Sequence, residues 1–286
     1  MTYLTIFVVA VALMLQNVWK QVFGERSKNG TVIFSAGISL FALVFFVAVN
    51  RNWSVEPRML PYALGFSLCY LSATLFAVLA IGAGSLAKTS LILSYSLLVP
   101  GLYGILCLDE PISAFLVVGL VLLAVSLFLV NYKKERDAKR VSWRWILYVV
   151  LAFLGNGLCS TVQKAEQLRF GSEGQELFMV ISLGLCTVFL LVTSLFFKSE
   201  RRNYRAIAKA GWWLAMLCGL VNGLVNYLIL YLNPRVPSSV LFPLVSGGSM
   251  ILVLLWALLI KKERFSVSQT VGFGVGVLSI VLLNIG

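Results

Sequence analysis

The 286-residue chain contains no histidine, and charged residues make up only 12% of it, about half the share in a soluble globular protein. Histidine is the commonest general base and metal ligand, so most metal sites and histidine-based hydrolases are excluded. The five cysteines lie singly within apolar runs and form no CxxC spacing, which indicates buried thiols rather than a disulfide framework or a zinc site. We therefore expect no enzyme activity, no cofactor and no metal.

Apolar residues account for 60% of the chain, too many for so few charges to keep it dissolved. They form ten runs of about 20 residues, the length that a helix needs to cross a bilayer core of about 30 Å. The runs are solid rather than alternating, which favours helices over a β-barrel. We predict an all-α integral membrane protein with ten transmembrane helices. The predicted spans are 2–19, 31–49, 61–81, 85–106, 112–131, 144–163, 175–197, 210–232, 237–260 and 266–285.

An internal repeat organises the chain. Residues 84–131 align with residues 237–284 without a gap, so that Ser126 falls on Ser279 and Gly119 on Gly272. A weaker match places Lys20 over Lys164 at the end of the first span of each half.

Each half contains five predicted spans, an odd number, so the second half enters the membrane in the opposite sense to the first. We predict two inverted five-helix repeats, residues 1–131 and 144–286, joined by a basic loop at 132–143.

The basic residues predict an orientation. Eighteen of the 23 lysines and arginines lie in loops that follow odd-numbered spans. The positive-inside rule places these loops in the cytoplasm and both termini outside, in a cell (inner) membrane. The formal net charge of +12 then serves to hold short loops against anionic lipid. We expect the lipid bilayer, and no nucleic acid, as the macromolecular partner.

The first span of each half ends in a polar stripe. Residues four apart share one face of a helix. The stripes are Gln16 and Lys20 in the first half, with Trp19 adjacent, and Asn156, Ser160 and Lys164 in the second. Two interpretations remain open: the lysines extend to the membrane interface, or the stripes line a cavity for an anionic or zwitterionic solute.

Other polar residues lie at mid-depth or at hinges. Tyr95, Asn222 and Asn226 either join helices to each other or bind a solute. Glu110 and Glu263 occupy the turn before the last span of each half, where capping of the following helix is favoured over a proton-coupling role. No Asp or Glu lies in the middle of a predicted span.

The hinge glutamates also carry a resemblance. Leu108, Asp109 and Glu110 precede Gly119, Lys262 and Glu263 precede Gly272, and a lysine closes the first span of each half. Over essentially its whole length the chain resembles the ten-helix branch of the drug/metabolite transporter superfamily, which has two EamA-type domains. The resemblance implies a carrier for small organic solutes, often an exporter of amino acids, with a central cavity between the halves.

Two features depart from that superfamily. The related four-helix multidrug proteins carry a carboxylate midway along the first helix, where this chain has Ala12, Leu13 and Met14. Transport of lipophilic cations by that mechanism is therefore not expected. Family members are also commonly drawn with both termini in the cytoplasm, opposite to the orientation that the basic loops predict.

We predict a secondary transporter that moves a small polar or amphipathic metabolite, such as an amino acid, by alternating access between the two repeats. The alternative is a flippase for a lipid-linked sugar or a related amphiphile. The expected partner is a small-molecule solute, and a monomer is compatible with either function.

Overall fold

The computed structural model describes residues 2–26, 30–83, 92–93, 96, 98–109, 112–131, 142–171, 174–259 and 267–285. Within these ranges the chain forms α-helices and one short 3-10 helix, η1 (Pro57–Met59), and no strand. The helices are α1 (Thr2–Arg26), α2 (Thr31–Val49), α3 (Leu60–Ala83), α5 (Leu98–Cys107), α6 (Ala114–Asn131), α7 (Trp143–Phe170), α8 (Gln175–Phe196), α9 (Lys198–Leu232), α10 (Ser238–Leu259) and α11 (Val267–Ile285).

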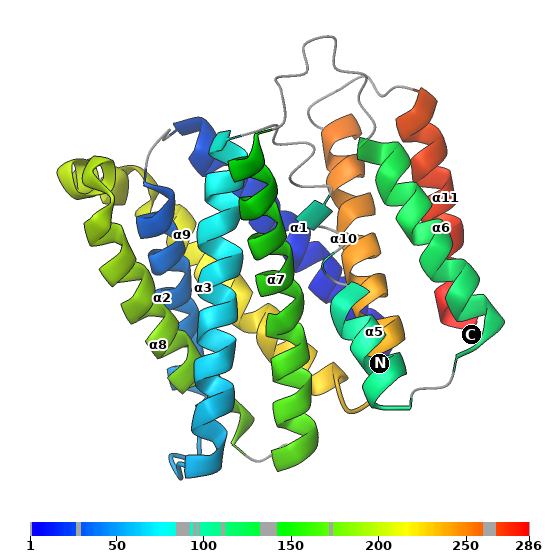
Figure 1. Ribbon diagram of the computed structural model, residues 1–286, viewed down its shortest axis with the longest axis horizontal. Coiled ribbons are helices and arrows are strands. Elements are labelled where there is room, and N and C mark those ends of the chain that lie inside the picture. The colour runs from blue at the N-terminus through cyan, green and yellow to red at the C-terminus, as the bar shows by residue number, and fades with distance from the viewer. Residues whose placement is uncertain are drawn as a thin grey trace.

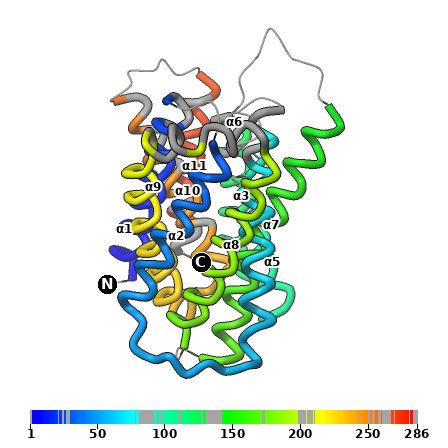
Figure 2. The backbone as a smooth tube through the Cα atoms, turned by 90° about the vertical axis from the view of Figure 1, so that its left-hand side faces the viewer, coloured from blue at the N-terminus to red at the C-terminus, as the bar shows by residue number. Residues whose placement is uncertain are grey.

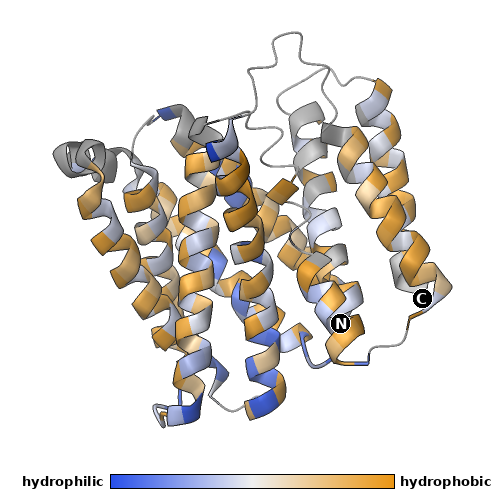
Figure 3. Cartoon of the chain, viewed as in Figure 1, coloured by the Kyte–Doolittle hydropathy of each residue, from blue (hydrophilic) through white to orange (hydrophobic). Residues whose placement is uncertain are grey.

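Six segments of the described chain are long and apolar enough to cross a membrane, and α6 and α11 contribute shorter apolar segments, Ala114–Ser126 and Thr270–Ser279. Large apolar side chains such as Phe196 and Val267 are 80% and 82% exposed. Hydrophobic residues cover much of the outer faces of the helices (Figure 3), as contact with lipid requires. The chain is therefore an all-helical, multi-pass membrane protein.

α2, α3, α6, α8, α10 and α11 agree with the predicted spans within a few residues. α1 ends at Arg26 instead of 19, α9 begins at Lys198 instead of 210, and the fourth span also differs. Residues 92–93 are helical, Ser96 lies in a turn in which its backbone N–H donates to the Leu93 carbonyl at 3.1 Å, and α5 begins only at Leu98. α7 also extends seven residues beyond the predicted end at 163. This extension places Glu166 inside a helix.

Local signals explain several helix starts. The Ser142 hydroxyl accepts a hydrogen bond from the Trp145 backbone N–H at 3.1 Å and so caps α7. α2 and α8 each follow a glycine in the left-handed region, Gly30 at φ 103° and Gly174 at φ 86°. Glycine adopts this conformation without the steric cost that other residues have.

Eight helices form a closed circuit of neighbours. α3 packs on α7, α7 on α5, α5 on α10, α10 on α1, α1 on α9, α9 on α2, α2 on α8, and α8 again on α3. Figures 1 and 2 show these helices standing roughly side by side. α7 and α9 consequently lie on opposite arcs of this ring.

A pair formed by α6 and α11 stands outside the ring next to α10, and its two helices run in opposite directions (Figure 1). The Ser126 hydroxyl donates to the Gly272 carbonyl at 2.6 Å, and the Ser279 hydroxyl donates to the Gly119 carbonyl at 2.7 Å. Both bonds are buried. They are reciprocal in the repeat, because Ser126 aligns with Ser279 and Gly119 with Gly272.

The largest aromatic core lies where α2, α3, α7 and α8 meet. Phe46, Phe178 and Met179 are fully buried there, and Phe66 meets Phe178 edge to face at a centroid distance of 5.9 Å. Such side chains fill the space between helices at the density of an organic crystal.

Close helix approach depends on glycine at particular positions. A Cβ at Gly155 of α7 would lie 2.6 Å from the Ala73 backbone nitrogen and 2.7 Å from the Cys69 carbonyl oxygen of α3. Backbone atoms cannot move aside as a side chain can. Gly155 therefore sets the spacing of α3 and α7.

We predict that Gly155→Ala destabilises the protein by about 1–3 kcal/mol, because the added methyl group forces α3 and α7 apart. The measurement is the unfolding temperature in detergent, followed by fluorescence-detected gel filtration. Gly184→Ala in α8 is the matched control, since a Cβ there has no described atom within 4 Å. It should leave stability unchanged or raise it by up to about 1 kcal/mol. Equal effects of the two substitutions on the unfolding temperature would contradict the role of Gly155 in setting the spacing of α3 and α7.

Candidate functional site

A row of side-chain amides joins α1 to α9. The Asn226 Nδ2 group donates to the Asn222 side-chain oxygen at 3.0 Å, and the Asn222 Nδ2 group donates to the Gln16 Oε1 atom at 3.3 Å. Gln16 is 1% exposed, and its Nε2 group has no hydrogen-bond partner among the described residues. The structure thus brings together three predicted site residues and leaves one buried donor unused.

Lys20 lies one helical turn beyond Gln16 on the same face of α1. Its side chain is exposed, and the Cys218 thiol of α9 donates to the Gln16 backbone carbonyl at 3.9 Å one turn away. Lys20 therefore continues the amide row toward one end of the bundle. Trp19 is half-buried and packs against a cluster of α1, α2 and α9 side chains that includes Phe23 and Phe34.

The second polar stripe lies on α7. The exposed Asn156 donates from Nδ2 to the Ser96 hydroxyl at 2.6 Å, at the turn before α5, and Ser160 is half-buried one turn further along. Gly157 lies between these residues, and a Cβ there would meet the Ser96 carbonyl oxygen at 2.7 Å. The stripe is therefore anchored at α5, and no described hydrogen bond joins it to the Gln16 row.

Lys164 closes the α7 stripe in a different setting from Lys20. It is 5% exposed, and its Nζ atom donates to the Asn233 carbonyl at the end of α9 at 2.5 Å. One turn later, the Gln167 Nε2 group donates to the Leu230 carbonyl at 2.6 Å. These polar residues lie toward the hydrophilic lower end of α7 (Figure 3). In this conformation Lys164 binds a helix end rather than extending to the membrane interface.

Comparison of the sequence with protein families matches residues 140–285 to the EamA-like transporter family. The chain belongs to the EamA-like transporter family. This match confirms the resemblance found in the sequence and identifies the protein as a membrane transporter of the drug/metabolite superfamily.

Solved structures contain the same fold, whereas no curated protein matches the chain. One chain, described as "Crystal structure of protein", matches with a TM-score of 0.77 at 12% sequence identity. The match covers 99% of the EamA-like chain and 96% of the solved one. At this identity the similarity concerns the fold alone.

Glu166 is a buried acid that the sequence reading missed. It is 0% exposed, and neither carboxyl oxygen has a hydrogen-bond partner among the described residues. It continues the face of α7 that holds Gly155, Cys159 and Val162, which pack on α3. Their spacing of four, three and four residues is the signal that identifies this face. The predicted span ends at 163, three residues before Glu166.

Three predicted residues lie outside the described part of the chain. These are the candidate solute ligand Tyr95 and the hinge residues Glu110 and Glu263. Their predicted roles stay predictions.

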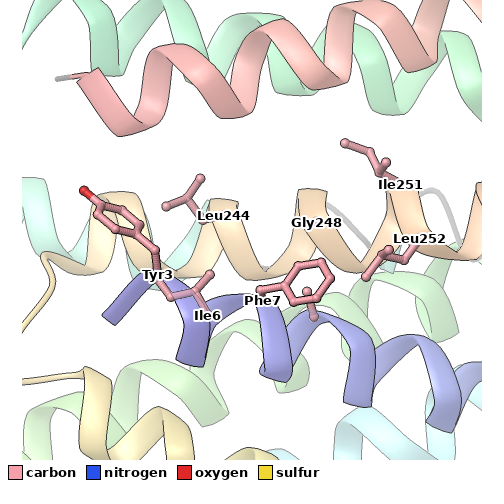
Figure 4. A pocket seen from close by; sticks show the side chains of 8 residues that line it. Tyr3, Ile6, Phe7, Leu244, Gly248, Ile251 and Leu252 are labelled. Atoms are coloured by element: carbon pink, nitrogen blue, oxygen red, sulfur yellow. The ribbon is translucent and has the colours of Figure 1, made fainter. Parts of the chain in front are cut away.

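An apolar pocket of about 470 Å³ lies between α1 and α10 and shares no residue with the polar stripes. Figure 4 shows Tyr3, Ile6 and Phe7 on α1 and Leu244, Ile251 and Leu252 on α10 around it. Its lining offers few hydrogen-bonding groups. This pocket therefore fits a hydrocarbon chain better than a polar solute.

We predict that Glu166→Met stabilises the EamA-like transporter in detergent. An unsatisfied buried polar group costs about 1–3 kcal/mol, and methionine removes it at similar side-chain length. Thermal unfolding should therefore occur at a higher temperature. Gln167→Met is the matched comparison: it removes a formed hydrogen bond to Leu230, and should lower the unfolding temperature. A lower temperature for Glu166→Met would mean that the carboxyl group is satisfied in the protein.

Proposed function

We propose that the protein is a secondary transporter that moves a small polar or amphipathic metabolite, such as an amino acid, by alternating access between two inverted repeats. The observation that carries the proposal is the buried amide row of Gln16, Asn222 and Asn226, which retains an unused donor beside the solvent-accessible Lys20. An unused polar group in a membrane bundle is costly unless a ligand or water pairs with it.

The repeat architecture, with residues 1–131 and 144–286 as its halves, has support in the packing. The reciprocal bonds Ser126–Gly272 and Ser279–Gly119 relate α6 and α11 by a two-fold operation. Neighbours in the ring also occur in matching pairs: α1 packs on α9 as α7 packs on α3, and α1 on α10 as α7 on α5. Helix pairs of one half thus recur in the other with the roles of the halves exchanged, as inverted repeats require.

The solute class follows from the charge and hydrogen-bonding capacity of the site. Lys20 supplies a cation, and Gln16, Asn156 and Asn222 supply amides. A carboxylate pairs with the ammonium group, and the amides bind polar groups of either kind. This combination suits an anionic or zwitterionic metabolite. In the orientation that the basic loops predict, Lys20 lies toward the cytoplasmic side of a cell (inner) membrane and Lys164 toward the outer side.

The test is efflux of labelled amino acids from proteoliposomes, comparing wild type with Asn222→Leu. Removing the amide breaks the row between Gln16 and Asn226, so we expect transport to fall by roughly tenfold or more, as loss of a buried hydrogen-bonding group does. Thr193→Val is the matched control, because in the described part of the chain its hydroxyl bonds to the Phe189 carbonyl of its own helix and to no other residue. It should transport at the wild-type rate. The proposal fails if no solute moves above empty vesicles.

One observation favours a second function, the flipping of a lipid-linked sugar or related amphiphile. The apolar pocket between α1 and α10 accommodates an acyl or prenyl chain, while the polar stripes accommodate a headgroup. Substituting Gly248 by tryptophan would fill this pocket. Loss of lipid flipping with undiminished amino-acid efflux in this variant would assign the pocket to an amphiphile. Loss of amino-acid efflux with undiminished lipid flipping would favour the soluble metabolite.

A further inference from the structure

Two hydrogen bonds cross the helix ring at one end. α7 and α9 belong to opposite arcs of the ring, yet Lys164 and Gln167 of α7 bind the carbonyls of Asn233 and Leu230 at the end of α9. Both donors are buried, at 5% and 6% exposure. These bonds therefore tie the two arcs together at this end of the bundle.

The carbonyls involved need partners from outside their own helix. The last four carbonyls of an α-helix have no intrahelical donor. In α9, Leu232 accepts from the Arg235 and Val236 backbone N–H groups, and Tyr231 accepts from the Arg235 guanidinium. α7 supplies the donors for Leu230 and Asn233. An ammonium group is also favoured at this position because a helix carries negative partial charge at its C-terminus.

At the opposite end of the bundle, the equivalent lysine and helix end are not hydrogen-bonded to each other within the described part of the chain. Lys20 aligns with Lys164 in the repeat. In the proposed symmetry, α1 corresponds to α7 and α3 to α9. The C-terminal ends of α1, which holds Lys20, and of α3 lie at the same end of the bundle (Figure 1). Lys20 is exposed, and no hydrogen bond joins its ammonium group to a described residue.

We infer that Lys164 and Gln167 form a gate that closes one end of the transport pathway, and that Lys20 closes the other end by binding the last carbonyls of α3. The inference rests on the alternating access proposed above. The conformation in this structure has the Lys164 gate closed and the Lys20 gate open. Transport then requires the two lysines to exchange their bound and free states.

The exchange of the two lysines between bound and free states keeps one ammonium–carbonyl bond in each conformation. Opening one gate breaks an ammonium–carbonyl bond at a helix end, and closing the other forms an equivalent bond, so the two conformations differ little in free energy. The gates are not identical. Phe23 takes the place of Gln167 in the first half, and it stacks on Phe34 at a centroid distance of 3.8 Å instead of crossing the ring. The Lys164 gate therefore has one more hydrogen bond than the Lys20 gate.

Chemical labelling of a single cysteine measures the gate without any solute. The reporter is Ser160→Cys, one turn inward from Lys164, in a chain whose five cysteines are replaced by serine. A membrane-impermeant maleimide is added to membrane vesicles on the side of the Lys164 end, and the rate of labelling is followed. The rate reports the fraction of molecules in which this end is open.

We predict that Lys164→Met raises the labelling rate by roughly tenfold or more, because a hydrogen bond from a charged group contributes at least one factor of ten in the equilibrium. Gln167→Leu should raise it in the same direction by a smaller factor, and it replaces Lys164→Met if that variant does not fold. Adding Lys20→Met to Lys164→Met should return the rate toward wild type, since both gates are then weakened. Arg169→Met is the control with unchanged rate, because Arg169 makes a surface hydrogen bond to the Tyr62 hydroxyl on the neighbouring α3.

Three results would overturn the inference. An unchanged labelling rate in both Lys164→Met and Gln167→Leu would show that these residues do not close this end. A labelling rate in the double variant equal to that of Lys164→Met would show that Lys20 does not close the other end. An equal increase in Arg169→Met would mean that any loss of positive charge at this end loosens it. Because labelling needs no substrate, the gates can fail while efflux persists, and efflux can fail while the gates behave as expected.

Discussion

Every polar group in this bundle has to find a partner inside the protein, because the surrounding lipid offers none. Several serine and threonine hydroxyls meet this requirement on backbone carbonyls, either of their own helix or of a neighbour. The Ser67 hydroxyl donates to the Ser182 carbonyl at 2.8 Å, and the Ser72 hydroxyl donates to the Leu151 carbonyl at 3.0 Å. Short donors of this kind need helices in close contact, which the glycines at the α3–α7 and α2–α9 contacts permit. Hydrogen bonding of these hydroxyl groups therefore depends on the close packing of the helices.

Against that background, the groups that lack a partner are informative. Gln16 keeps an unused donor, and Lys20 stays accessible within the bundle. In the proposed function these groups pair with the solute, and binding would recover the free energy that an unpaired buried polar group costs. Glu166 lacks a partner as well, but it lies on the α3-facing side of α7, within the wall of the ring.

Helix ends raise the same problem at a larger scale. The terminal carbonyls of α9 receive donors from the following turn and from α7. The bonds from Lys164 and Gln167 satisfy the carbonyls at the end of α9. The same bonds also join two opposite arcs of the helix ring at that end of the bundle. In the proposed gate, Lys20 would satisfy the carbonyls at the end of α3 in the conformation in which Lys164 releases the end of α9.

Much of this architecture was predictable from the sequence, because helix periodicity and bilayer thickness act locally. The apolar runs defined most helices within a few residues, and the stripe of Asn156, Ser160 and Lys164 lies on one face of α7. The sequence repeat that aligns Ser126 with Ser279 corresponds to the two equivalent hydrogen bonds that these serines make between α6 and α11. Tertiary structure alone decided which stripes meet. The pairing of Gln16 with Asn222 spans 206 positions, and the separate settings of Lys20 and Lys164, like the burial of Glu166, depend on which helix stands opposite. A sequence pattern determines the face on which a side chain lies; the partner that this face meets is determined by packing between distant segments, which no local period encodes.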